Sequence, residues 1–177
     1  MRIFFKSILY ITIFLFVLVL FLPKEKIYNY YVAKLQSYNI NFESQKIVST
    51  MNGLILENSK VKYLDIKVMK SNTIDINTYF LYSKIFITNI DIDTILNAYL
   101  PLKINHITLT HNILKPNLIQ IESKFNEGSL AGYINIMDEK VFLKLHPSKQ
   151  YIQQYKAVMA NFKKDESGPF YTYEYSF

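Results

Sequence analysis

Histidine carries most acid–base and metal chemistry in proteins, and this chain of 177 residues has three histidines. His106 and His111 are five positions apart, so on one strand their side chains would point to opposite faces. His146 directly precedes Pro147, a residue that suits the first turn of a helix. The sequence contains no HExxH motif and no nucleophile elbow. The histidines therefore predict neither a catalytic site nor a metal site.

The carboxylates favour turns and a helix cap over a metal site or a catalytic site. Asp91 and Asp93 fall on one face of a predicted strand and could mimic a calcium pair, but a turn and a helix cap explain them more simply. Asp138 and Glu139 predict a hairpin turn. Cysteine is absent, which excludes a thiolate zinc site and a cysteine nucleophile. We therefore expect a protein that is not an enzyme, with no cofactor.

The hydrophobic residues are unevenly distributed along the chain. The run Ile3–Leu22 has three polar positions and no acidic residue, and about 20 apolar residues are enough to cross a hydrocarbon core of roughly 30 Å. Arg2 and Lys6 precede most of the run, which predicts a cytoplasmic N-terminus and an exported C-terminal part. A cleaved signal peptide is the competing interpretation, but no small-x-small pair follows the run. We expect an uncleaved, single-pass transmembrane anchor over 1–22 and an inner-membrane location.

The balance of charge is mildly basic, with a formal net charge of +6. The lysines are scattered and do not form the basic stripe that nucleic-acid binding needs. A basic surface close to a membrane fits anionic headgroups. The expected partners are therefore the inner membrane and proteins of the envelope, and not nucleic acid.

The exported part begins with a segment of helical periodicity. Apolar residues recur at helical spacing over 24–37, and Pro23 suits the first turn of a new helix. We expect 23–40 to form a juxtamembrane amphipathic helix and linker. The apolar stripe of this helix either lies on the bilayer or packs on the domain; its members are Ile27, Tyr28, Tyr31, Val32 and Leu35.

Residues 41–177 alternate between apolar and polar side chains in about nine short runs, which is typical of antiparallel strands. The parity of the alternation slips after Tyr63, which predicts a bulge or a tight bend. A short helix is expected over 94–99, and a longer helix near 148–163 opens at Pro147. The predicted fold is mainly β: a transmembrane helix, then a curved antiparallel sheet, half-barrel or jellyroll-like, in a periplasmic domain with one or two short covering helices.

The predicted last strand, 170–177, alternates with unusual regularity. Its aromatic residues share one face, and the simplest interpretation is a strand that pairs with the sheet. The alternative is an aromatic edge that accepts a partner strand. The candidate residues for groove or partner-strand contacts are Ile134, Ile136, Leu143, Tyr171, Tyr173, Tyr175 and Phe177.

Three short motifs carry a resemblance to a known family. The exit from the apolar run reads Leu22-Pro23-Lys24-Glu25-Lys26-Ile27-Tyr28. A segment of the form G-L-x-L-x-N-x-x-V begins at Gly53, and one of the form G-x-L-x-G-x-I-x-I begins at Gly128 and leads to His146-Pro147. The chain resembles the type II secretion system protein N family and the broader AsmA-like periplasmic proteins. The resemblance implies a membrane-anchored periplasmic protein without catalytic residues.

Two functions follow as alternatives. The first is a non-enzymatic, inner-membrane-anchored periplasmic protein that supports an envelope secretion or assembly system. The second is a transport module that binds lipid or lipopolysaccharide in an apolar β groove, similar in layout to lipopolysaccharide-export proteins. An open sheet edge and a filled core favour the first function. An apolar groove left between the sheet and the 148–163 helix favours the second.

Overall fold

The computed structural model of the protein describes residues 2–79, 81–93, 103–166 and 168–176. The helices are α1 (Arg2–Phe21), α2 (Lys24–Gln36), α3 (Lys149–Gln154) and α4 (Lys156–Met159). The strands are β1 (Ile40–Glu43), β2 (Lys46–Ser49), β3 (Gly53–Tyr63), β4 (Ile66–Thr78), β5 (Tyr82–Ile92), β6 (Lys103–Asn112), β7 (Lys115–Phe125), β8 (Gly128–Asn135), β9 (Lys140–Pro147), β10 (Lys163–Lys164) and β11 (Tyr171–Ser176). The helix expected over 94–99 lies outside the described residues.

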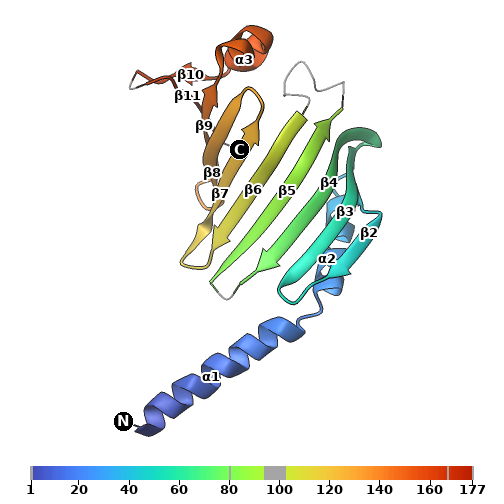
Figure 1. Cartoon of the computed structure of the whole chain (residues 1–177), viewed down its shortest axis with the longest axis vertical. Helices are drawn as coiled ribbons and strands as arrows, with labels where there is room; N and C mark the ends of the chain where they lie inside the picture. The colour runs from blue at the N-terminus through green and yellow to red at the C-terminus, as the bar shows by residue number, and fades with distance from the viewer. Residues whose placement is uncertain (1, 80, 94–102, 167, 177) are drawn as a thin grey trace.

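Helix α1 covers the apolar run, and Figure 1 shows it projecting away from the sheet. The large apolar side chains that the structure describes on it are exposed, among them Phe4, Tyr10 and Phe14. Within the described part of the chain we find no helix whose length and hydropathy together match a membrane span. The transmembrane role expected for 1–22 therefore stays a prediction.

The strands form one antiparallel sheet that does not close on itself. Its order is β1-β3-β4-β5-β6-β7-β8-β9-β11-β10, and β2 pairs with β3 beside β1. From β3 to β9 each strand pairs with the next in the chain, and antiparallel neighbours need no crossover. The mainly β prediction is confirmed. The described strands form one open sheet, in which β3–β9 are a meander, and not the two packed sheets of a jellyroll. Two short strands before Gly53, and β10, are additional to the predicted series.

The tight bend predicted after Tyr63 is a two-residue hairpin turn. Leu64 and Asp65 both have positive φ angles, of 49° and 63°, which is the backbone pattern of a type I′ turn. The turn reverses the chain between β3 and β4, so the apolar residues change parity while staying on one face of the sheet. The hairpin predicted at Asp138 and Glu139 is also present, with Glu139 at a φ of 51°.

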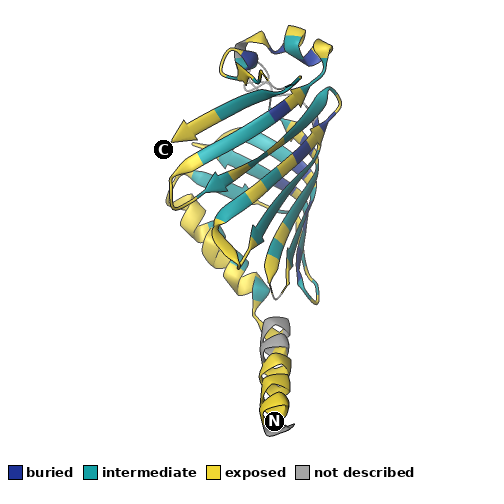
Figure 2. Cartoon of the chain, turned by 90° about the vertical axis from the view of Figure 1, so that its left-hand side faces the viewer, coloured by how far each residue is buried: buried dark blue, intermediate teal, exposed yellow. Residues whose placement is uncertain are grey.

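The apolar residues of the meander lie in rows across the sheet. One row runs through eight strands from Leu54 on β3 to Tyr173 on β11; its members are Leu54, Ile76, Ile85, Leu109, Ile121, Gly132, Leu143 and Tyr173. Residues directly opposite each other in neighbouring strands share a face. The sheet therefore has one nearly continuous apolar face. Figure 2 shows that the sheet is curved, and this face is its concave side because residues from β4 to β11 on it line one cavity.

Two helical segments cover opposite ends of this face. Helix α2, which matches the predicted juxtamembrane helix, packs Tyr28 against a cluster of Leu54, Leu56 and Ile74. The other residues of its predicted apolar stripe are mostly exposed, including Tyr31 and Leu35. At the far end, α3 and α4 bury Tyr151, Tyr155 and Met159 against Phe125 and Leu145.

The single helix predicted over 148–163 is wrong in its extent. The chain leaves the helical conformation at Tyr155, with φ of −111° and ψ of 48°, and Lys163 and Lys164 form β10 and not a helix end. At the break, the rings of Tyr151 and Tyr155 lie with centroids 4.7 Å apart and tilted by 37°, and both rings are buried in the same cluster. The packing role predicted for the stripe is confirmed.

Candidate apolar ligand site

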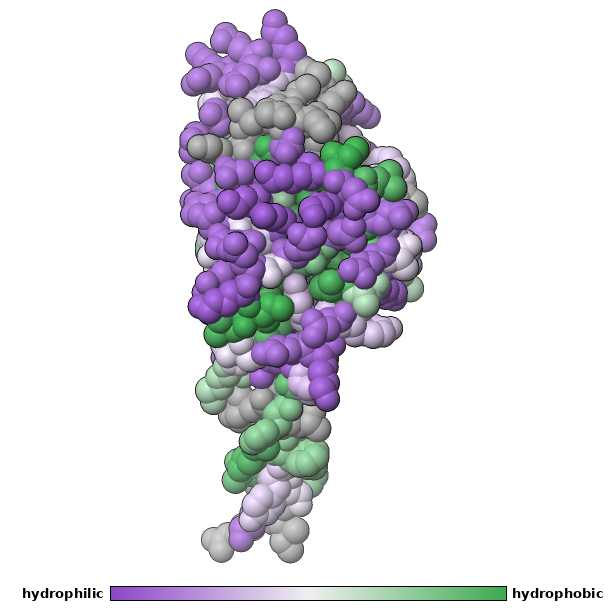
Figure 3. All heavy atoms as spheres, turned by 90° about the vertical axis from the view of Figure 1, so that its right-hand side faces the viewer, coloured by the Kyte–Doolittle hydropathy of each residue, from purple (hydrophilic) through white to green (hydrophobic). Residues whose placement is uncertain are grey.

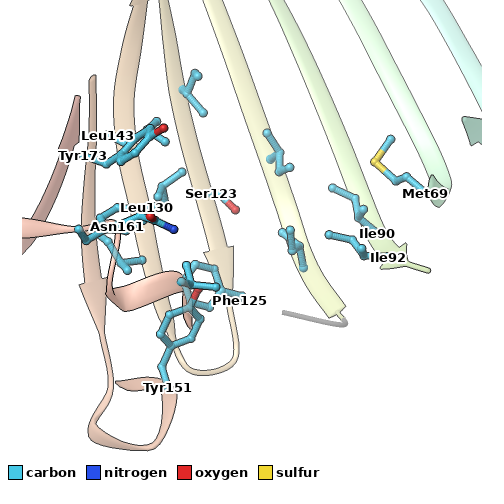
Figure 4. A pocket seen from close by; sticks show the side chains of 16 residues that line it. Met69, Ile90, Ile92, Ser123, Phe125, Leu130, Leu143, Tyr151, Asn161 and Tyr173 are labelled. Atoms are coloured by element: carbon cyan, nitrogen blue, oxygen red, sulfur yellow. The ribbon is translucent and has the colours of Figure 1, made fainter. Parts of the chain in front are cut away.

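A cavity of about 460 Å³ lies between the concave face and the α3–α4 segment. Figure 4 shows Leu130, Leu143 and Tyr173 on one side of it and Met69, Ile90 and Ile92 on the other. The lining is almost wholly apolar and includes no charged residue; the full set is Met69, Ile90, Ile92, Ile104, Ile107, Ile121, Ser123, Phe125, Leu130, Leu143, Leu145, Tyr151, Val158, Asn161, Phe162 and Tyr173. The volume is in the range of small-molecule sites.

The register of the sheet builds the floor of the cavity. Ile107 pairs with Ser123, Ser123 with Leu130, and Leu130 with Leu145, so these side chains form a second row beside the Leu54–Tyr173 row. Gly132 lies in the first row opposite Leu143, and a Cβ there would meet the Phe142 carbonyl oxygen at 2.1 Å. A side chain at this position would force β8 and β9 apart, so the close pairing of these two strands requires glycine.

The α3–α4 segment forms the roof. Ser148 is the N-cap of α3, where its side-chain oxygen accepts a hydrogen bond from the Tyr151 backbone N–H at 3.1 Å. The Tyr151 ring contacts Phe125 on β7, with ring centroids 5.2 Å apart. Burial, reinforced by the neighbouring Tyr155 and Glu127, raises the pKa of the Tyr151 hydroxyl to about 12. The roof therefore holds a neutral, apolar surface over the cavity at physiological pH.

Few polar atoms face this space. Ser123 on β7 is buried, and Asn161 follows α4 at the margin of the cavity. On the same face, Ser71 is fully buried and its hydroxyl oxygen has no hydrogen-bond partner. A site with so little polar lining cannot compensate the desolvation of a charged group. It can accept hydrocarbon.

Two of the predicted contact residues, Leu143 and Tyr173, line the cavity. Tyr171 packs against the core cluster beneath α3 and α4. Ile134 lies on the same face near the other end of the sheet, while Ile136 and Tyr175 are exposed there, by 53% and 52%. Phe177 lies outside the described residues. The structure thus separates the predicted set into residues that line the cavity, one residue that packs against the core cluster, and residues near the turns at the other end of the sheet.

Most of the cavity residues did not appear in the predicted set. They lie on β4–β9 and on the α3–α4 segment with the residues after it, and include Met69, Ile90, Ile104 and Phe125. Phe125 belongs to a predicted alternating run, so the pattern places it on one side of the sheet. Met69, Ile90 and Ile104 belong to no predicted run. The feature that selects them is cross-strand register, since Ile90 pairs with Ile104 and Ile104 with Phe125.

The residues considered first for chemistry are dispersed. His106 lies beside Phe86, and His146 lies beside Phe170, with ring centroids 5.5 Å and 5.0 Å apart. His111 Nε2 is 2.9 Å from the Pro116 carbonyl oxygen. Asp93 lies 3.9 Å from Lys67 in an ion pair. Among the residues that the structure describes, no group of three or more metal-ligating side chains comes together.

Comparison with known proteins adds no assignment: no protein-family model, no curated protein sequence and no solved structure matches this chain. The resemblance to secretion and AsmA-like proteins therefore stays a prediction based on short motifs.

Proposed function

We propose that this protein is a membrane-anchored periplasmic module that binds the hydrocarbon part of a lipid on the concave face of its sheet. The observation that carries the proposal is the apolar cavity between the sheet and the α3–α4 segment. It corresponds to the groove whose presence would favour lipid binding over a purely structural role. No catalytic residue is assigned.

The chemistry of the lining supports an acyl chain as the ligand. Each methylene moved from water into an apolar site contributes about 0.8 kcal/mol. A chain with about ten buried methylenes would therefore gain roughly 8 kcal/mol before the cost of ordering it, which is enough for stable binding. The headgroup would have to lie outside the cavity, because no charged side chain lines the interior.

The proposed location rests on α1 and on the charge around it. The exposed apolar side chains of α1, including Phe5, Phe14 and Phe21, would be covered by hydrocarbon in a bilayer. Arg2 and Lys6 at its start favour a cytoplasmic N-terminus. The sheet would then lie in the periplasm, held close to the inner membrane by α2.

Photo-crosslinking of the full chain in proteoliposomes tests lipid binding. The probe is a phospholipid that carries a diazirine on its acyl chain, and crosslinked peptides are identified by mass spectrometry. We expect crosslinks on β6–β9 in addition to those on α1. Leu143→Trp would fill the cavity and should reduce the crosslinks on the sheet by tenfold or more, about 1.4 kcal/mol of binding.

The matched control is Phe142→Trp. Phe142 is adjacent in sequence but lies on the opposite face, where it stacks on Tyr133 with ring centroids 5.4 Å apart. It should leave the crosslinks on the sheet unchanged. Crosslinks confined to α1 in all three proteins, with the variants folded by circular dichroism, would overturn the proposal.

The free edge of the sheet supports the first of the two predicted functions as a second candidate. Strand β10 pairs with Thr172 and Tyr171 only, so the described residues from Tyr173 to Ser176 have a paired strand on one side and none on the other. An exposed edge of this kind can accept a strand from an envelope secretion or assembly protein. Backbone pairing there would be compatible with lipid binding on the concave face.

A further inference from the structure

Large apolar side chains are concentrated in the turns at one end of the sheet. Turn positions usually carry Gly, Pro, Asn, Asp or Ser, yet here Leu114 and Met137 are each 75% exposed at hairpin turns. We name these residues the hairpin-tip patch; its members are Met51, Tyr79, Leu81, Tyr82, Ile113, Leu114, Ile136 and Met137. At the opposite end, the described hairpin turns are Leu64–Asp65, where Tyr63, Leu64 and Ile66 are exposed, and the polar turn Asn126–Glu127.

The hairpin-tip patch is a continuous rim and not a set of separate loops. Backbone hydrogen bonds join successive tips: Thr78 N–H donates to Asn52 O at 2.8 Å, Ile113 N–H to Leu81 O at 2.9 Å, and Ile136 N–H to Asn117 O at 2.8 Å. Within one tip, the rings of Tyr79 and Tyr82 stack with centroids 4.6 Å apart. The exposed apolar side chains are therefore held in place along one edge of the molecule.

The position of this rim identifies its partner. The chain leaves α1 and enters α2 beside the same end of the sheet, where the Ser49 hydroxyl donates a hydrogen bond to Glu25 Oε1 at 2.7 Å. Figure 1 shows the turns of the β2–β3, β4–β5 and β6–β7 hairpins at the end of the sheet that is nearer to α1. A membrane that holds α1 would therefore lie next to the rim.

We propose that the hairpin-tip patch docks on the surface of the bilayer, an inference that rests on the proposed anchoring by α1. Tyrosine rings suit the membrane interface because one end is apolar and the other polar, and apolar side chains gain by entering the headgroup boundary. Lys84 and Lys115 flank the tips, while Asp138 and Glu139 beside Met137 carry the opposite charge, so apolar contact and not net charge drives the docking.

Docking in this orientation gives the concave face a direct connection to the membrane. Ile119 pairs with Ile134, Ile134 with Val141, and Val141 with Tyr175, and this row lies between the cavity and the tips. An acyl chain that leaves the bilayer at the rim would pass over these residues to the cavity without crossing water.

Site-specific fluorescence in proteoliposomes tests the docking, because the natural chain has no cysteine. Leu114→Cys and Met137→Cys place the polarity-sensitive dye NBD on two different tips. Ile66→Cys, at an exposed position at the opposite end, is the matched control, and Phe21→Cys reports insertion of α1. The vesicles contain phosphatidylethanolamine and phosphatidylglycerol, with and without a phospholipid carrying a nitroxide near its headgroup.

The expected result is a blue shift and nitroxide quenching of both tip probes and of the Phe21→Cys probe, with no change for Ile66→Cys. Quenching of Phe21→Cys without quenching of either tip probe would overturn the docking and leave the anchor intact. Equal quenching of Ile66→Cys would also overturn it, since contact would not be specific to the tips. An unquenched Phe21→Cys probe would overturn both the anchor and the docking.

Discussion

At the scale of single residues, the few buried polar groups on the concave face are uncharged, and one of them has no hydrogen-bond partner. Ser59 is buried but its hydroxyl lies 2.9 Å from the Ser44 hydroxyl, whereas the Ser71 hydroxyl, in the neighbouring strand, is buried without a partner. Tyr151 is 3% exposed. These groups make the interior of the face neutral, which suits hydrocarbon and excludes ions.

The burial of Tyr151 predicts a loss of stability at high pH. The pKa of Tyr151 is about 12 in the folded chain against 10.0 in the unfolded chain, so the unfolded state loses its proton first. Between pH 10 and 12 the free energy of unfolding should therefore fall as pH rises, by roughly 2–3 kcal/mol for this group. Urea unfolding at pH 9 and pH 12 measures the change.

The variant Tyr151→Phe cannot ionise and should lose that part of the pH dependence. At pH 8 the phenol is neutral in both states, so the variant and the natural protein should have similar free energies of unfolding there. An alkaline loss of the same size in the variant would contradict the assignment to Tyr151.

At the scale of elements, the sheet is assembled from local hairpins and the roof from a short, capped segment. The six residues of α3 are too few to form a stable helix alone, so α3 depends on the Ser148 cap and on packing through Tyr151. The Tyr155 break redirects the chain so that Val158 and Phe162 also reach the cavity. The α3–α4 segment is consequently the part of the domain that depends most on tertiary packing for its helical structure.

The cap prediction concerns the Ser148→Ala variant. Loss of the cap should cost about 1 kcal/mol, which corresponds to roughly fivefold faster hydrogen exchange of the α3 and α4 amides. Exchange in β4 and β5 should not change. Ser148→Thr, which keeps a side-chain acceptor, is the control; equal exchange in the two variants would show that the hydroxyl does not hold the roof.

At the scale of the whole molecule, an open curved sheet has a free edge, a concave face and two ends. The concave face carries the cavity, the β11 edge is partly free, and one end presents the hairpin-tip patch beside the exit from α1. These features are compatible with the proposed function, in which α1 lies in a membrane and the sheet lies on one side of it. The side is predicted by Arg2 and Lys6.

Topology follows from labelling of single cysteines in intact spheroplasts with a membrane-impermeant maleimide. Asn161→Cys, at an exposed position after α4, should react fully because the domain is expected to be periplasmic. Lys6→Cys should be protected until the membrane is permeabilised. Protection of Asn161→Cys in intact spheroplasts would refute an exported domain.

The local structure could be predicted from the amino-acid sequence: an apolar N-terminal helix, a short second helix, a series of antiparallel strands and the turns at Leu64 and Asp138. These depend on periodicity and turn chemistry over a few residues, which are readable without knowing the fold. The alternating Tyr171–Tyr175 face was likewise predicted as a strand of the sheet, and it is one.

Which of these residues come into contact depends on the fold and could not be predicted from local patterns. Leu54 and Tyr173 are far apart in sequence but belong to one row because seven strand registers add up. The cavity, the break at Tyr155 and the alignment of the tips all depend on such long-range register and on the curvature of the sheet. Alternation fixes the face on which a side chain lies, but not its neighbours on that face.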